Sequence, residues 1–331
     1  MRPSLLAIII GLGIVAAVVW PGPDRGPAAT TTITFTPTDP TPNQTVQLTT
    51  TSGTTGTWRV NGKRLGNSTT VTHRFAAGNH SISIENHTRS LVVAPSSCRP
   101  YHLNGPSQEK ADVVFVARNY MDRETWQDHL SYYLDLDQDN RGLFDIYPMN
   151  ISTETFNLWT LNASTAIGTY DDPRNGRGLI KDARRDWFGT CSIADYHVLM
   201  SKDDFNHSAF AYGQANEMYI PGIADKIERE EGAVALPHEW GHGFGGLKDE
   251  YYNSDGRDAS GPPNCADNRS QAERWWGELA QRDPAVGYYQ GCAYTDTNWR
   301  PHEQSIMGNG GRWRYGPVND RKLLAVLDQY D

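Results

Sequence analysis

The sequence lacks several features that would assign it to common classes of protein. Its 331 residues include 30 Lys or Arg and 39 Asp or Glu, so the formal net charge is -9. This balance argues against nucleic acid as a partner, because binding phosphates needs a basic surface. The sequence also has no Gly-rich phosphate loop and no Ser/His/Asp pattern. Nucleotide-dependent and serine-hydrolase chemistry therefore have no support in it.

Cysteine is scarce, and no two cysteines have the CxxC spacing of a metal cluster. The even number favours two disulfides and therefore an exported protein. We expect Cys265–Cys292, which closes a local loop, and Cys98–Cys191, although four cysteines allow three pairings. Eight N-x-S/T sequons suggest a glycoprotein. They lie at Asn43, Asn67, Asn79, Asn86, Asn150, Asn162, Asn206 and Asn268.

There is one long apolar run, near the N-terminus. It extends from Leu5 to Trp20, follows Arg2 and is ended by Pro21, Gly22 and Pro23. Sixteen residues is long for the core of a signal peptide and slightly short for a membrane span. We interpret residues 1–20 as a signal peptide or an uncleaved membrane anchor, and residues 21–30 as a stalk. The protein is then expected outside the cell or at the cell surface.

Residues 31–94 consist of short Thr/Val/Ile-rich runs, such as TVQLTT and HSISIE, separated by turn residues. Apolar residues alternate along these runs, and turns recur about every 8–12 residues, which predicts a small antiparallel β-sandwich. The order of features loosely resembles polycystic-kidney-disease-type and other Ig-like modules. Such a module either binds substrate or a surface, or acts as a spacer. Residues 95–110 are interpreted as a linker.

Residues 111–331 alternate between strand-like and helix-like patterns. Strands are expected at 111–120, 156–163, 195–202 and 218–221, and helices at 123–134, 178–188 and 320–330. Asp122 is expected to cap the first of these helices, and Ser270 with Glu273 forms a capping box for another. Alternating elements predict an α+β domain with a mixed sheet.

The motif LPHEWGHGFGGLKDEY contains an HExxH triplet formed by His238, Glu239 and His242. Residues four apart on a helix share a face, so the two imidazoles can bind one metal ion. Glu239 lies beside the first histidine, where a carboxylate can act as general base and acid on a water molecule. Pro237 predicts either a helix start or a kink. The glycines after His242 predict that the helix ends near Phe244.

A catalytic zinc site normally has three protein ligands. The metzincin spacing HExxHxxGxxH would place the third at position 248, which is Lys248. A protonated ammonium has no lone pair to donate, so this residue is excluded. Asp249 and Glu250 follow directly, and both stay open as the third ligand.

The sequence H-E-W-G-H-G-F-G-G-L-K-D-E-Y resembles the H-E-x-G-H-x-x-x-x-L-x-D-E-Y signature of the IgA-specific metallo-endopeptidase family, which are metzincin-like zincins. The resemblance extends over most of 111–330 and includes a PPN segment, a Trp-rich helix, GYYQGCAY and SIMG. It implies one catalytic Zn²⁺ held by His238, His242 and Asp249, with Glu250 as the alternative ligand. It also implies a Met-turn at Met307 beneath the site.

Two further residues are candidates for contact with substrate or the transition state. Tyr315 is one, because some metzincins use a tyrosine after the Met-turn, and His302, shortly before Met307, is the other. An extended substrate is expected to pair with an edge strand, for which residues 218–221 are the candidate.

These features together predict a secreted or membrane-tethered zinc metallo-endopeptidase acting on protein or peptide substrates. A zincin-fold adhesion protein without turnover and a zinc amidase acting on cell-wall peptides are the alternatives.

Overall fold

The computed structural model describes most of the chain after the stalk. The described residues are 31–136, 142–161, 176–203, 208–228, 233–253, 260–308 and 313–330. The expected signal or anchor (residues 1–20), the stalk (21–30) and the sequons at Asn162 and Asn206 lie outside these ranges. Among the described residues, no helix is long and apolar enough to cross a membrane.

The N-terminal unit consists of two antiparallel sheets, one of three strands (order β1-β2-β5) and one of four (β4-β3-β6-β7). The strands are β1 (Ile33–Thr36), β2 (Thr45–Thr50), β3 (Gly56–Val60), β4 (Lys63–Ser68), β5 (Thr70–Arg74), β6 (Gly78–Ile84) and β7 (His87–Val93). Side chains from both sheets share one core around the fully buried Trp58. Alternate residues of β6 are buried, as the period-2 pattern predicted.

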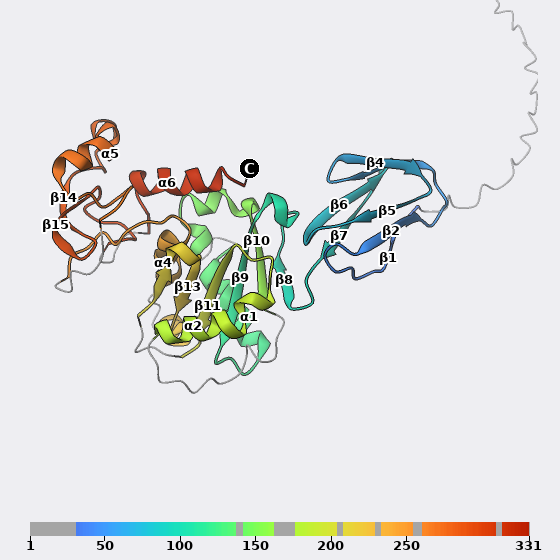
Figure 1. Cartoon of the computed structure of the whole chain (residues 1–331), viewed down its shortest axis with the longest axis horizontal. Coiled ribbons are helices and arrows are strands. Elements are labelled where there is room, and N and C mark those ends of the chain that lie inside the picture. Colours follow the sequence, from blue (N-terminus) through green and yellow to red (C-terminus); the bar gives the residue numbers. More distant parts are fainter. Residues whose placement is uncertain are drawn as a thin grey trace, which may run out of the picture.

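The larger unit is built on a six-stranded mixed sheet of order β12-β13-β11-β9-β10-β8 (Figure 1). Its strands are β8 (Cys98–His102), β9 (Ala111–Arg118), β10 (Phe156–Leu161), β11 (Tyr196–Ser201), β12 (Phe210–Tyr212) and β13 (Glu217–Ile220). The four inner strands run parallel, and β8 and β12 are antiparallel edges. The segment interpreted as a linker, residues 95–110, therefore contributes β8. That interpretation was wrong, because pairing with β10 overrides the weak strand pattern of CRPYH.

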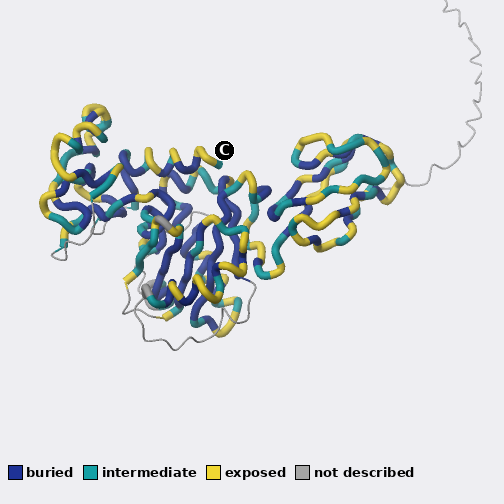
Figure 2. Tube along the Cα trace, viewed as in Figure 1, coloured by how far each residue is buried: buried dark blue, intermediate teal, exposed yellow. Residues whose placement is uncertain are grey.

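Both faces of this sheet are covered, and the inner strands are buried except at His197 of β11, which is half-buried (Figure 2). Val113 and Phe115 of β9 face a core that includes Trp126 of helix α1 (Arg123–Leu134) and Trp240 of the HExxH helix α4 (Ala235–Gly243). Val114 and Val116 face the opposite way, onto helix α2 (Gly176–Asp186). The alternation along one strand thus produces a layered α/β unit.

The N-terminal cap expected from the sequence is present at helix α1 and differs at a second helix. Asp122 caps α1, its side chain accepting from the backbone N–H of Thr125 at 2.7 Å. Helix α5 (Arg269–Arg282) is capped by Asn268, which accepts from the N–H of Gln271 at 3.0 Å, and not by Ser270 as expected. The helix starts earlier because Asn is as good a cap as Ser and stands two residues before it.

Two further α-helices and a hairpin belong to the described part. They are α3 (Ile223–Glu228), α6 (Pro317–Leu327) and a hairpin of β14 (Tyr289–Cys292) and β15 (Thr295–Arg300). Figure 1 shows α5 and this hairpin together, at the opposite side of the sheet from the N-terminal unit. Both expected disulfides are present, Cys98–Cys191 and Cys265–Cys292.

Candidate metal centre

The two histidines project from α4, and the packing of this helix explains its glycines. The helix begins at Ala235, so Pro237 lies in its first turn, where the backbone N–H groups have no intrahelical partner. A Cβ on Gly241 would lie 2.4 Å from Sδ of Met307 and 3.1 Å from Cε1 of Tyr315. Met307 is fully buried against the helix. The glycine therefore allows the segment around Met307 to pack directly against α4.

A tight turn after α4 reverses the chain. The N–H of Gly246 donates to the carbonyl of His242 at 3.0 Å, and the N–H of Leu247 donates to the carbonyl of Gly241 at 3.0 Å. The first of these bonds is that of an αL helix cap, and Gly246 occupies its left-handed position with φ 63°. The helix ends at Gly243, as expected, and the reversal returns residue 249 to the face of α4 that carries the histidines.

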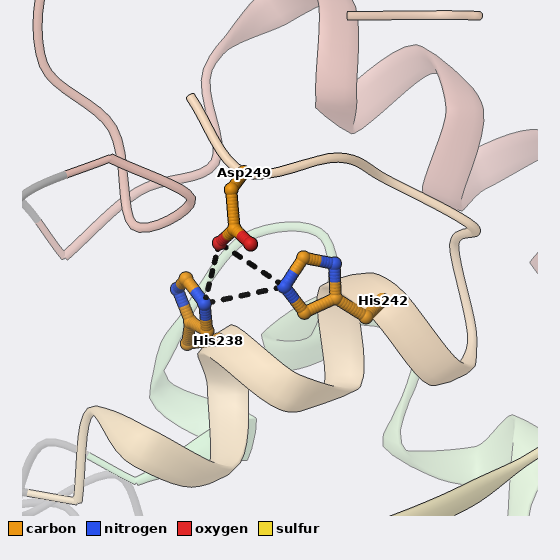
Figure 3. Close-up of side chains that lie close together, drawn as sticks. All are labelled: His238, His242 and Asp249. Atoms are coloured by element: carbon orange, nitrogen blue, oxygen red, sulfur yellow. Dashed lines mark hydrogen bonds and ion pairs between the residues drawn. The ribbon is translucent and has the colours of Figure 1, made fainter. Parts of the chain in front are cut away.

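Three side-chain atoms converge on one point (Figure 3). Oδ1 of Asp249 lies 3.1 Å from Nε2 of His238 and 3.3 Å from Nε2 of His242, and the two Nε2 atoms are 3.3 Å apart. Among the described residues, these three form the one group of His, Cys, Asp or Glu side chains arranged so that it could hold a metal ion. We call this group the cleft cluster.

The outward nitrogens of both imidazoles donate to backbone carbonyls. Nδ1 of His238 lies 2.7 Å from the carbonyl oxygen of Ile306, and Nδ1 of His242 lies 2.7 Å from that of Leu247. A carbonyl oxygen can only accept, so each Nδ1 carries the hydrogen and each Nε2 presents a lone pair to the cleft cluster. Neutral imidazoles held in this tautomer are ready to bind a metal through Nε2.

The electrostatics of the cleft cluster also fit a cation. Burial lowers the pKa of His238, but its hydrogen bond to Asp249 and the charge of Glu239 together have a larger, opposite effect and bring the pKa to about 9. Burial raises the pKa of Asp249, but its close contacts with the two histidines hold it far below the usual range. Oδ1 of Asp249 is buried beside the two Nε2 atoms. When the imidazoles are neutral, Oδ1 of Asp249 and the two Nε2 atoms each present a lone pair, with no donor hydrogen between them. Such an arrangement can bind a positive ion or a proton.

Glu239 and the cleft cluster open into a cleft of about 1400 Å³. One wall is formed by β12, from Phe210 to Tyr212, and another by Tyr251, Asn253 and Tyr294. The expected edge strand at residues 218–221 is wrong, because β13 is paired on both sides and β12 is the edge. A three-residue strand has too few positions for an alternating pattern, so the sequence did not reveal it.

Glu250 points away from the cleft cluster into a buried polar group, which we call the Glu250 cluster. Its carboxylate accepts from Oγ of Ser305 at 2.7 Å, from Nδ2 of Asn319 at 2.8 Å and from Nδ2 of Asn264 at 3.0 Å. Nδ1 of His302 lies 3.1 Å from the same carboxylate. The Glu250 side chain is 1% exposed. The structure therefore groups Asp249 with the histidines and leaves Glu250, the alternative ligand, outside that group.

The segment carrying Asp249 is held on two sides by residues that the sequence did not mark. Asn264 accepts from the N–H of Lys248 at 2.9 Å and donates to its carbonyl at 2.8 Å, which imitates a strand partner. On the other side, the N–H of Ala293 donates to the carbonyl of Asp249 at 2.8 Å. The Cys265–Cys292 disulfide links these two supports. The PPN segment of the family resemblance contains Asn264, which was the available signal.

The two other candidates do not reach the cleft. Tyr315 is fully buried and its hydroxyl donates to the carbonyl of Pro237 at 2.5 Å. His302 is buried against Glu250. Neither residue lines the cleft, so the expected contact with substrate does not agree with their positions. Both sit behind the cleft cluster and support the segments that form it.

Comparison with known proteins adds no family to this description. No protein-family model matches the chain, and no curated protein matches it significantly.

Proposed function

We propose that the protein is a zinc-dependent metallo-endopeptidase with a metzincin-like catalytic unit. The observation that carries the proposal is the convergence of His238, His242 and Asp249 beside Glu239 in an open cleft. Two imidazoles and one carboxylate are a ligand set that suits zinc and leaves a fourth position for water or substrate. A zinc ion bound there would supply Lewis acidity to a scissile carbonyl and lower the pKa of a water molecule.

The residues of the chain would do the rest. Glu239 follows His238 on the helix and lines the same cleft, so its carboxylate can take a proton from a water molecule and deliver it to the leaving amine. The unpaired edge of β12 borders the cleft, and an extended peptide would add to it as a further strand. Main-chain pairing of this kind favours protein or peptide substrates over small molecules.

The cellular setting is part of the same proposal. Two disulfides are typical of an oxidising compartment and support a secreted or membrane-tethered protein that carries N-linked sugars. The N-terminal unit would be an Ig-like module that binds substrate or a surface, or spaces the catalytic unit from the membrane. The acidic net charge argues against nucleic acid as a substrate.

The test is hydrolysis of a denatured-protein peptide library by the full-length protein, with products identified by mass spectrometry. The isosteric variant Glu239→Gln removes the general base and should lower kcat about 10²- to 10⁴-fold. Its zinc content should equal that of the wild type, because Glu239 is not a ligand. Cell-wall muropeptides belong in the same assay.

The outcomes separate the alternatives. Cuts made by the wild type and lost in Glu239→Gln establish a peptidase. Hydrolysis of muropeptides alone would favour the zinc amidase. A folded, zinc-loaded wild type that cleaves neither would favour an adhesion protein with no turnover.

A further inference from the structure

Two tyrosines from distant parts of the sequence meet at the rim of the cleft cluster. Tyr251 ends the LKDEY motif, and Tyr294 ends GYYQGCAY. Their hydroxyl oxygens are 3.0 Å apart, and their rings are 5.1 Å apart and nearly perpendicular at 87°. Both side chains line the cleft that contains Glu239. No role has been given to either residue above.

The backbone holds Tyr294 in this place at a cost. Ala293 and Tyr294 form the turn of the β14–β15 hairpin, with φ values of 49° and 62°. A two-residue hairpin turn requires left-handed backbone at both positions, which is unfavourable for a residue with a side chain. Such positions concentrate at functional sites, where the surrounding structure enforces them.

The segment that carries Asp249 keeps the turn in this conformation. The N–H of Tyr294 donates to the carbonyl of Tyr251 at 3.2 Å, next to the bond from Ala293 to Asp249. Cys292, the residue before the turn, is covalently tied to Cys265. The Tyr294 ring is thus fixed relative to Asp249 by two backbone bonds and a disulfide.

Both phenols can donate a hydrogen bond. A phenol has a pKa of about 10, so each hydroxyl carries its hydrogen at neutral pH. Both hydroxyls are also hydrogen-bonded to the Asp249 carboxylate, which places them beside the cleft cluster.

A donor of this kind would assist peptide hydrolysis beside the Lewis acidity of a bound zinc ion. When water adds to a scissile carbonyl, its oxygen gains negative charge, and a fixed donor in a partly water-excluded site stabilises that charge strongly. Tyr315 and His302 are buried behind the cleft and cannot supply it. Tyr294 lies on the cleft wall and its hydroxyl is oriented by that of Tyr251.

We propose that Tyr294 is a catalytic residue that donates a hydrogen bond to the scissile carbonyl oxygen as it becomes negative, and that Tyr251 positions the Tyr294 hydroxyl. This role rests on the proposed peptidase function. No proton is transferred, because the phenol stays neutral throughout.

The test compares Tyr294→Phe, Tyr251→Phe and the double variant in the full-length protein, on a peptide that the wild type cleaves. Tyr294→Phe should lower kcat about 10²-fold and change KM less than about threefold, as expected for a lost oxyanion donor. Tyr251→Phe should lower kcat about tenfold. The double variant should be no slower than Tyr294→Phe, because Tyr251 acts through it. Tyr252→Phe is the matched control, since Tyr252 is 52% exposed and does not line the cleft.

Two binding measurements do not depend on turnover. The Tyr294 hydroxyl is hydrogen-bonded to the Asp249 carboxylate, so zinc affinity from chelator competition should fall by no more than about tenfold in Tyr294→Phe, the low end for an outer partner and less than the loss in kcat. A phosphinic pseudopeptide, which imitates the tetrahedral state, should bind about 10²-fold more weakly to Tyr294→Phe by calorimetry.

Each other outcome overturns the proposal. Unchanged kcat and pseudopeptide affinity in Tyr294→Phe would exclude a contact with the reacting oxygen. A matching loss of zinc affinity would make Tyr294 a support for Asp249 only. A wild type that cleaves no peptide would remove the peptidase function first, and the role of Tyr294 with it.

Discussion

The cleft cluster and the Glu250 cluster are built from neighbouring residues and have opposite chemistry. In the cleft cluster, Oδ1 of Asp249 and two Nε2 atoms face one another with no donor hydrogen among neutral forms. In the Glu250 cluster, four side chains donate to or pair with one carboxylate that is almost fully buried. A cation or a proton would complete the first arrangement. In the second, the carboxylate already has its hydrogen-bond donors.

This difference assigns different tasks to two adjacent carboxylates. A buried charge is tolerated when hydrogen bonds and an opposite charge compensate it. Burial raises the pKa of Glu250, but the charge of His302 and the hydrogen bonds lower it more. Glu250 also anchors the Met307 segment, since its own N–H donates to the Met307 carbonyl at 2.7 Å. We infer that Asp249 binds the metal ion and that Glu250 stabilises the surrounding structure.

The largest expected difference between the two clusters comes from removing each carboxylate in turn. Asp249→Ala should weaken zinc binding by more than about 100-fold, since loss of a direct ligand exceeds the 10- to 100-fold cost of losing an outer partner. Chelator competition measures it. If Glu250→Ala lost zinc while Asp249→Ala kept it stoichiometrically, the assignment of the third ligand would be wrong.

Glu250→Gln should have its main effect on stability. The substitution removes the buried carboxylate that accepts from Asn264, Ser305 and Asn319, and should lower the free energy of unfolding by about 1–3 kcal/mol. Urea unfolding of the metal-free protein, followed by far-UV circular dichroism, measures this. Glu273→Gln is the control, because the Glu273 side chain is 53% exposed and its pair with Arg269 is on the surface. A loss under about 1 kcal/mol would contradict the structural role.

The variant Asn264→Ala tests whether Asn264, which bonds Glu250, also helps to position Asp249. Asn264 bonds Lys248 and Glu250 on both sides of Asp249, so its loss should lower zinc affinity about 10- to 100-fold. Asn157→Ala removes an equally buried amide that bonds Gly105 and Asp112 and not the segment of Asp249, and should leave zinc affinity unchanged. Equal zinc affinities for the two variants would show that Asn264 does not position the ligand.

The smallest expected effect is the dependence of zinc affinity on pH. The pKa of His238 is raised to about 9 in the metal-free protein, so below that pH a proton competes with zinc for the cleft cluster. Raising the pH by one unit between 6.5 and 8.5 should increase zinc affinity about tenfold, if one proton is released. Competition titrations across this range measure the slope. In Glu250→Gln the slope should persist, because that carboxylate is outside the cleft cluster.

Local patterns predicted the parts of the molecule that depend on local geometry. The helical period placed His238 and His242 on one face, and the glycines placed the end of α4. Alternating or continuous apolar runs predicted β9, β10 and β11, and the disulfide pairing was also correct. Elements with weak patterns were missed. Strand β8 contains Pro100 and β12 has three residues, so pairing with neighbouring strands, and not propensity, defines them.

The sequence by itself determined the candidate ligands, their spacing on the helix and the reversal after His242. The spacing alone left both Asp249 and Glu250 open, because neither lies on a helix whose period would orient it, and only the family resemblance favoured Asp249. The tertiary structure separated them: Asn264, Ser305, Asn319 and His302 come from three later segments and together surround Glu250. Each of these bonds joins residues at least 14 positions apart. Long-range contacts of this kind depend on how the elements pack, and no local pattern encodes them.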